Sequence, residues 1–175
     1  MRLQNKSLAM EIKILDNFLS QKDFSKVSDI CERATFTYGE RDNLDTPPTG
    51  MVHNIVESSL IFNIFKRETD QIVTDDLALD RMYINCFAPC ENPYYHIDNN
   101  DITFLYYANK EWKLDDGGET QFFIDEEIKG VVPKPNRMIY FDSPIPHKAT
   151  SFRDKHRFTV AIKYSCKNFF INYNN

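Results

Sequence analysis

The feature that most constrains the fold is a series of short strand-like segments that begins near residue 80. Each segment is rich in β-branched and aromatic side chains and ends at a turn or a polar stretch. We expect strands over residues 81–87, 102–108, 119–124, 130–133, 137–142 and 156–164. Asp115-Asp116-Gly117-Gly118 is typical of a turn between two of them. This series, preceded by helices, predicts a mainly β fold with some α, in which helices pack against a sandwich or barrel.

The first third of the chain has helical spacing instead. Apolar residues recur at intervals of three and four in Ile12, Leu15, Leu19, Phe24, Val27 and Ile30. Ser20 can cap a helix that starts near Gln21, with Asp23 at its third position. These patterns predict helices on both sides of Ser20.

Residues 37–50 are polar and contain two consecutive prolines, which predicts a loop. Helical spacing returns over residues 54–65, and we expect a further helix over residues 69–79. No internal repeat and no linker divides the chain. We therefore expect residues 1–175 to form one domain, with residues 1–79 as helical support and residues 80–165 as the β core.

Composition narrows the classes of partner. The net charge of −5 and the isoelectric point near 5.4 argue against a general surface for nucleic acid or anionic membrane. No apolar run approaches the roughly 20 residues that span a bilayer, and the N-terminal sequence has no signal-peptide core. We therefore expect a cytoplasmic protein, in which the four cysteines are thiols. Cys86 and Cys90 are not expected to bind zinc, because no second pair or nearby histidine completes a zinc site. Nothing in the sequence indicates an oligomeric state.

The last predicted strand carries a polar and an apolar face. One face holds Phe158, Val160, Ile162 and Tyr164, and the other holds Arg157, Thr159, Ala161 and Lys163. A strand with an exposed outer face would show the same alternation. Because Arg157 follows His147 by only a turn and a few residues, the polar face can instead look into a cavity.

Four polar residues in the second half suggest the content of such a cavity. His96 and Asp98 are separated by one residue, and His147 and Arg157 follow later in the chain. Two imidazoles and one carboxylate can cap one face of a ferrous ion and leave the other face open. A guanidinium close by can hold the carboxylate of an organic acid. Taken singly, each residue could be a surface or turn residue.

The order of these residues and their neighbours is more specific. His96-Ile97-Asp98, residues 105–109, Trp112, residues 117–120, Phe141-Asp142, Pro146-His147 and Arg157 follow one another in a single string. This string resembles the Fe(II)/2-oxoglutarate-dependent dioxygenases of the prolyl 4-hydroxylase-like type, including small phage and bacterial members. The similarity covers roughly residues 80–165. It implies a double-stranded β-helix, or jelly roll, with supporting N-terminal helices.

The resemblance also implies roles for residues. His96, Asp98 and His147 would bind iron, and Arg157 would bind the distal carboxylate of 2-oxoglutarate. Thr159, two residues along the same face, can add a hydrogen bond to that carboxylate. Similar enzymes place a tyrosine hydroxyl at Tyr107 and a pocket-lining residue at Thr120. No catalytic residue beyond the metal centre is indicated.

One position departs from the family. Such enzymes often carry a second cosubstrate-binding tyrosine on the strand before the first histidine, where this chain has Phe87. Tyr83 and Asn85 share the face of Phe87 and could substitute for the missing hydroxyl. Lysine is the cosubstrate anchor in some relatives, but Lys163 is too far from His147 for the common spacing, so we favour Arg157.

The activity implied is hydroxylation of an unactivated C–H bond with Fe(II), 2-oxoglutarate and O2, releasing succinate and CO2, with ascorbate as reductant. A prolyl residue in a peptide is the first substrate expected. A free small metabolite, such as an amino acid or sugar nucleotide, is the alternative. A non-catalytic jelly-roll binding module and a cupin-like metal enzyme without 2-oxoglutarate are rival interpretations. No substrate-binding residue is identified, although residues 37–50 and 88–95 are the loops expected to contact a substrate.

Overall fold

The computed structural model describes residues 11–167. Within them the chain forms ten strands, two α-helices and a 3-10 turn at Leu114–Asp116. The helices are α1 (Gln21–Arg33) and α2 (Leu60–Thr69). The strands are β1 (Ile12–Leu15), β2 (Thr37–Tyr38), β3 (Met51–Asn54), β4 (Leu77–Phe87), β5 (Ile102–Tyr107), β6 (Thr120–Ile124), β7 (Glu127–Val131), β8 (Arg137–Asp142), β9 (His147–Ala149) and β10 (Arg157–Cys166). The ends of the expected domain, residues 1–10 and 168–175, lie outside this range.

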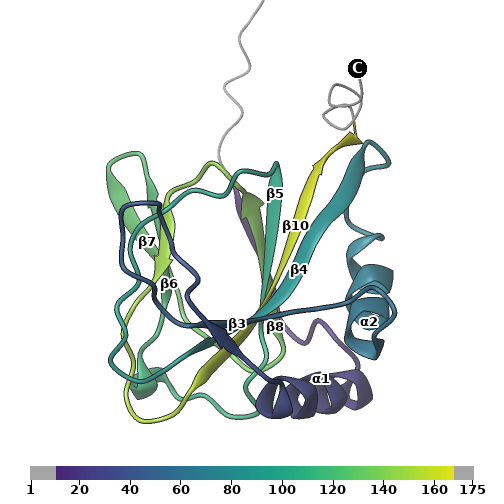
Figure 1. Ribbon diagram of the computed structural model, residues 1–175. Coiled ribbons are helices and arrows are strands. Elements are labelled where there is room, and N and C mark those ends of the chain that lie inside the picture. Colours follow the sequence, from purple (N-terminus) through teal and green to yellow (C-terminus); the bar gives the residue numbers. More distant parts are fainter. Residues whose placement is uncertain (1–10, 168–175) are drawn as a thin grey trace, which may run out of the picture.

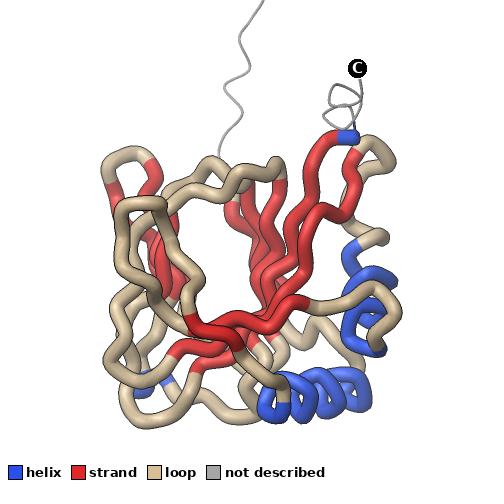
Figure 2. Tube along the Cα trace, viewed as in Figure 1, coloured by secondary structure: helices blue, strands red, loops and turns tan. Residues whose placement is uncertain are grey.

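Two sheets face each other (Figures 1 and 2). The major sheet has seven antiparallel strands in the order β1-β8-β5-β10-β4-β3-β2, and the minor sheet has three in the order β7-β6-β9. Helices α1 and α2 lie on one side of the major sheet, away from β6 and β7. The mainly β class with packed helices is therefore confirmed.

Alternation along β10 divides the core in two. Its even-numbered residues pack with α1 and α2 in one apolar cluster, which includes Val27, Phe65 and Ile162. A second cluster between the sheets contains Phe122 of the minor sheet and Phe141 of the major sheet. The odd-numbered residues of β10, from Arg157 to Lys163, line a pocket between the sheets. The predicted cavity-facing polar face of this strand is confirmed.

The helix start at Gln21 is confirmed as well. The Ser20 side chain accepts a hydrogen bond from the Asp23 backbone N–H at 3.1 Å. This bond satisfies one of the backbone donors that every helix leaves unpaired at its first turn. Ser59 caps α2 in the same manner through Phe62 N–H.

Two helix predictions were wrong, and a third helix begins later than predicted. Residues 12–15 form β1, which pairs with β8 at the edge of the major sheet. Residues 51–54 form β3, so the helix expected from residue 54 begins only at Leu60. The helix expected over residues 69–79 is absent from the described chain, because α2 ends there and β4 begins at Leu77. The apolar spacing in such short segments is compatible with a helix or a strand. Residues 12–15 and 51–54 form strands because they hydrogen-bond to neighbouring strands of the major sheet.

Smaller differences concern strand ends and thiols. The loop expected over residues 37–50 begins with the two-residue strand β2, and the strand expected at 130–133 lies at Glu127–Val131. All four cysteines are free, with Cys31 and Cys86 buried and Cys90 exposed. None of the helices in the described part of the chain is both long and apolar enough to cross a membrane.

Candidate metal centre and cosubstrate pocket

The two candidate histidine ligands are joined through their backbones. His96 N–H donates to the His147 carbonyl at 3.1 Å, and His147 N–H donates to the His96 carbonyl at 2.9 Å. His147 begins β9, whereas His96 lies in the segment between β4 and β5. This isolated antiparallel bridge brings together two residues that are far apart in the sequence.

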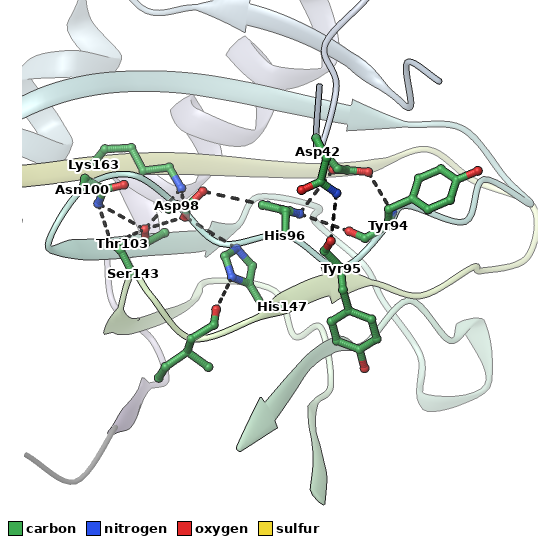
Figure 3. Close-up of polar contacts among 12 residues, drawn as sticks. Asp42, Tyr94, Tyr95, His96, Asp98, Asn100, Thr103, Ser143, His147 and Lys163 are labelled. Carbon is green, nitrogen blue, oxygen red and sulfur yellow. Dashed lines mark hydrogen bonds and ion pairs between the residues drawn. The ribbon is translucent and has the colours of Figure 1, made fainter. Parts of the chain in front are cut away.

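Asp98 completes a compact cluster with them (Figure 3). Nε2 of His96 lies 3.9 Å from Oδ1 of Asp98, and Nε2 of His147 lies 3.6 Å from Oδ2. One ligand atom from each residue lies within 4.8 Å of the others. Two imidazole nitrogens and one carboxylate oxygen at this separation suit a divalent transition metal and leave further coordination positions for other ligands. The structure thus brings the three predicted residues together.

Backbone carbonyls orient both rings. Nδ1 of His147 lies 2.9 Å from the Ile145 carbonyl, and Nδ1 of His96 lies 3.1 Å from the Tyr94 carbonyl. A carbonyl only accepts, so each Nδ1 must carry the proton in these contacts. A ring that keeps its proton on Nδ1 offers the Nε2 lone pair to the cluster centre.

Protonation states also suit metal binding. Burial lowers the pKa of His147 to about 4, which keeps the imidazole neutral at pH 7. Burial alone would raise the pKa of Asp98, but the charge of Lys163, together with hydrogen bonds from Lys163 and Thr103, holds the pKa below its ordinary value. The carboxylate is therefore ionised and able to coordinate.

Neighbouring side chains hold the second oxygen of Asp98. Both the Lys163 ammonium and the Thr103 hydroxyl donate to Oδ2, the latter at 2.7 Å. Ser143 Oγ lies 2.9 Å from Thr103 Oγ1 and accepts from Asn100 at 2.6 Å. Burial lowers the pKa of Lys163, and Asp98 opposes that shift. This network fixes the carboxylate, and among its members only Lys163 was predicted from the sequence to face inward.

The loop between β2 and β3 contributes a further carboxylate. Asp42 Oδ1 lies 3.4 Å from Nδ1 of His96, and Oδ2 accepts from Tyr94 N–H and the Thr49 hydroxyl, each at 2.8 Å. Asn43 of the same loop donates to the Tyr95 carbonyl at 3.0 Å. The loop predicted to contact substrate is thus fastened to the segment that carries His96 (Figure 3). Nothing in the local sequence of Asp42 indicated this contact.

The pocket continues along β10 to a buried arginine. Arg157 is 2% exposed and donates to Thr120 Oγ1 at 2.9 Å, while its guanidinium carbon lies 5.2 Å from the Tyr107 ring centroid. Tyr107 and Thr120 share a hydrogen bond of 2.8 Å. Burial raises the pKa of Tyr107, so its hydroxyl stays neutral. The structure therefore groups Arg157, Tyr107 and Thr120 as expected.

Two polar atoms at this end have no partner within residues 11–167. They are Nε of Arg157 and Oγ1 of Thr159, and both are fully buried. Buried donors without partners cost about 1–3 kcal/mol each, so native proteins seldom retain them. A carboxylate bound between them would accept both hydrogen bonds, and the arrangement fits the distal end of a 2-oxo diacid.

Strand β4, the neighbour of β10 in the major sheet, extends the same wall of the pocket. Phe87, Asn85 and Tyr83 line the pocket and lie across from Arg157, Thr159 and Ala161 in the register of β4 and β10. Phe87 thus lies beside Arg157, at the end of the pocket that has the unpartnered donors. Asn85 lies across from Thr159 and Tyr83 across from Ala161, so the substitution of either side chain for the missing hydroxyl stays a prediction.

A polar groove adjoins the pocket. The two share Asp42, Tyr83, Asn85, Phe87, His96 and Lys163. The rest of the groove is lined by Glu40, Arg41, Thr49, Asp80, Arg81, Ile97, Asp98, Asn99 and Asn100. Charged and amide side chains dominate, and His96 and Asp98 form part of the wall. A second molecule in this groove would lie beside the metal cluster.

Comparison with known proteins agrees with this geometry. Residues 84–165 match the model of the 2OG-Fe(II) oxygenase superfamily. The chain carries a 2OG-Fe(II) oxygenase domain. It is a 2-oxoglutarate-dependent dioxygenase, and the two rival interpretations, a non-catalytic module and a cupin-like enzyme, are not supported. No curated protein matches the chain.

Solved structures show the same fold. A Pseudomonas putida prolyl 4-hydroxylase has a TM-score of 0.74 at 14% identity, with 90% of this chain and 94% of that chain covered. A Trichoplax adhaerens prolyl hydroxylase, in complex with a hypoxia inducible factor peptide fragment, has a TM-score of 0.75 at 16% identity and coverages of 94% and 87%. HygX from Streptomyces hygroscopicus, with nickel, 2-oxoglutarate and hygromycin B, has a TM-score of 0.71 at 10% identity and coverages of 91% and 84%. The jelly-roll prediction is confirmed.

Proposed function

We propose that this oxygenase hydroxylates an unactivated C–H bond, with His96, Asp98 and His147 as its iron ligands. The observation that carries the proposal is one continuous pocket with two complementary ends. One end holds two imidazoles whose Nε2 atoms face an ionised carboxylate, and the other holds unpartnered buried donors of Arg157 and Thr159. A divalent metal and a dicarboxylic 2-oxo acid are the pair of ligands that satisfies both ends.

Each residue then has a defined task. Arg157 and Thr159 bind the distal carboxylate, and Thr120 and Tyr107 hold the guanidinium and the pocket wall in place. Phe87 offers an apolar surface beside Arg157, which excludes water from that ion pair. Residues 1–175 act as one oxygenase domain in this proposal.

Iron, when bound, supplies the activation of O2 that no side chain can perform. Overall, one oxygen atom of O2 enters the hydroxylated product and the other enters succinate, while 2-oxoglutarate loses CO2. Ascorbate would keep the iron ferrous between turnovers. The protein's part is to hold the target carbon beside the metal and to exclude solvent.

A prolyl residue in a peptide is the first substrate candidate. Its support is the fold, which is shared with prolyl hydroxylases, one of them in complex with a peptide fragment. Peptide hydroxylation requires a surface that accommodates chain on both sides of the target residue.

A polar small metabolite is the second candidate, and the groove favours it. Glu40, Asp42, Asp80, Arg41 and Arg81 line the groove, so a bound apolar ring would strip water from charged groups without replacing their hydrogen bonds. A free amino acid or a sugar derivative would supply those bonds. The structure of HygX, which has the same fold and contains hygromycin B, supports this candidate.

Succinate release tests the proposal. The protein is incubated with Fe(II), 2-oxoglutarate, ascorbate and either prolyl peptides or polar metabolites, and succinate and a product 16 mass units heavier are measured. We expect succinate to depend on Fe(II) and to rise with the true substrate. A protein that binds neither divalent metal nor 2-oxoglutarate would contradict the proposal.

A further inference from the structure

A lysine lies against the candidate iron ligands. Lys163 is 7% exposed on the inner face of β10, and its Nζ contacts Oδ2 of Asp98 and lies 3.2 Å from Thr103 Oγ1 (Figure 3). It lines the same pocket as Arg157 and also the polar groove. A fixed cation in contact with a metal ligand is not required for coordination, so its role needs a separate explanation.

The charges around the cluster define the problem. When the three ligands coordinate they carry one negative charge, on Asp98, because an imidazole that binds a metal through Nε2 and donates from Nδ1 is neutral. Lys163 pairs with that charge. A divalent ion that enters alone therefore meets an ion pair with no net charge, together with the repulsion of a nearby ammonium. At about 5 Å and an effective dielectric constant of about 20, this repulsion corresponds to well over tenfold in affinity.

The cosubstrate reverses this balance. Arg157 is too far along the strand to contact the metal ligands and is satisfied by one carboxylate of a dicarboxylic acid. The other carboxylate brings a second negative charge to the metal end, where Lys163 faces the same pocket. Lys163 then attracts the 2-oxo acid, whereas it repels the divalent metal ion.

We propose that Lys163 couples the two binding events, so that a divalent metal binds weakly alone and tightly together with 2-oxoglutarate. The proposal rests on the proposed function, because it assumes the same metal and cosubstrate. Lys163 is a positioning residue in this scheme, since it acts through Asp98 and through its charge.

The test is a comparison of Mn(II) affinity by isothermal titration calorimetry, without and with saturating 2-oxoglutarate, corrected for Mn(II) chelation by free 2-oxoglutarate. Lys163→Gln removes the charge but can still donate a hydrogen bond to Asp98. Thr103 also keeps its bond to Oδ2 in this variant. We expect Lys163→Gln to bind Mn(II) alone at least about tenfold more tightly, and the gain produced by 2-oxoglutarate to fall at least about tenfold.

Two controls separate charge from packing. Lys163→Arg keeps the charge and should retain the wild-type gain within about threefold. Lys148→Gln removes a cation that lines the same pocket but lies over the Tyr95 ring, and it should change the gain by less than about twofold. Circular dichroism establishes that each variant is folded, and Lys163→Met replaces the Gln variant if that one is not.

Several outcomes would overturn the proposal. Mn(II) affinity in Lys163→Gln that is equal to or weaker than wild type would contradict it, as would an unchanged gain or an equal effect of Lys148→Gln. If wild-type protein bound no Mn(II) with or without 2-oxoglutarate, the proposed function itself would be wrong, and the coupling with it.

Discussion

Strand β10 presents two buried cations on one face, and they differ in what surrounds them. Arg157 and Lys163 are 2% and 7% exposed and both line the pocket. Lys163 contacts Asp98 and Thr103, so its charge is paired within the protein. Arg157 donates to Thr120, yet its Nε has no partner in the described chain, and neither does the neighbouring Thr159 hydroxyl.

This difference separates a binding end from a metal end. A buried donor without a partner is costly, so the Arg157 end fits the proposed binding of an anion. The Lys163 end is already balanced, and its polar groups orient a ligand carboxylate. Arg157 and Lys163 are both buried and both basic. What distinguishes the proposed anion-binding residue from the proposed metal-end residue is therefore the set of groups that each side chain contacts.

Removal of a metal-end ligand should have the largest effect. His147→Ala and Asp98→Ala each delete one of the three proposed protein ligands, and we expect iron-dependent succinate release to fall to background. His156→Ala is the matched control, because His156 is exposed and lies outside the cluster. Full activity in either ligand variant would show that the metal lies elsewhere.

The metal end should also make stability depend on pH in the metal-free protein. His147 has a folded pKa of about 4 against 6.5 in the unfolded chain, so the unfolded chain binds the extra proton first as pH falls. The free energy of unfolding should therefore fall between about pH 6.5 and pH 4, by up to about 3 kcal/mol, and level off below.

Chemical denaturation in the presence of a chelator measures this dependence. His147→Gln lacks the titrating ring, so the difference in stability between wild type and this variant should carry the pH dependence. A difference that stays constant from pH 7 to pH 4 would mean that His147 is not held neutral by burial.

At the anion end, Arg157→Met should weaken 2-oxoglutarate binding about a hundredfold, or roughly 3 kcal/mol, because charged hydrogen bonds of this kind are worth about 1.5–3 kcal/mol each. Mn(II) affinity without 2-oxoglutarate should change by less than about twofold. Titration of the Mn(II)-loaded protein with 2-oxoglutarate measures the first effect. Arg153→Met, at an exposed position, is the control, and equal losses in both variants would remove Arg157 from its role.

Sequence patterns predicted the site residues at both ends of the pocket but not every element of the fold. Alternation along residues 157–164 placed both cations on the inner face, and residue order singled out His96, Asp98, His147 and Arg157. Both signals can be read directly from the sequence, because side chains alternate between the two faces of a strand and because the site residues follow one another in a recognisable order. Helical spacing at residues 12–15 failed because pairing with β8, a long-range contact, decides that segment.

The side chains that surround the proposed ligands could not be predicted from local sequence patterns, because their contacts are also long-range. Asp42 reaches His96 from a loop more than fifty residues earlier, and Lys163 reaches Asp98 across β10 and the β4–β5 segment. Each contact depends on how the loop and strands lie in space. A polar loop residue with no periodicity gives no indication of its partner.

Asp42 gives the smallest effect that we expect. Its Oδ1 lies 3.4 Å from Nδ1 of His96, and carboxylates behind metal-bound histidines typically contribute 10- to 100-fold to metal affinity, at about the lower figure here because Tyr94 also accepts from Nδ1. Asp42→Asn keeps an acceptor for Tyr94 N–H and Thr49 but removes the charge, so Mn(II) affinity should fall about tenfold. Asp80→Asn removes a carboxylate from the same groove without touching His96, and its Mn(II) affinity should stay within about twofold of wild type. Equal losses in the two variants would mean that the general field of the groove, rather than the contact with His96, sets the strength of the metal end.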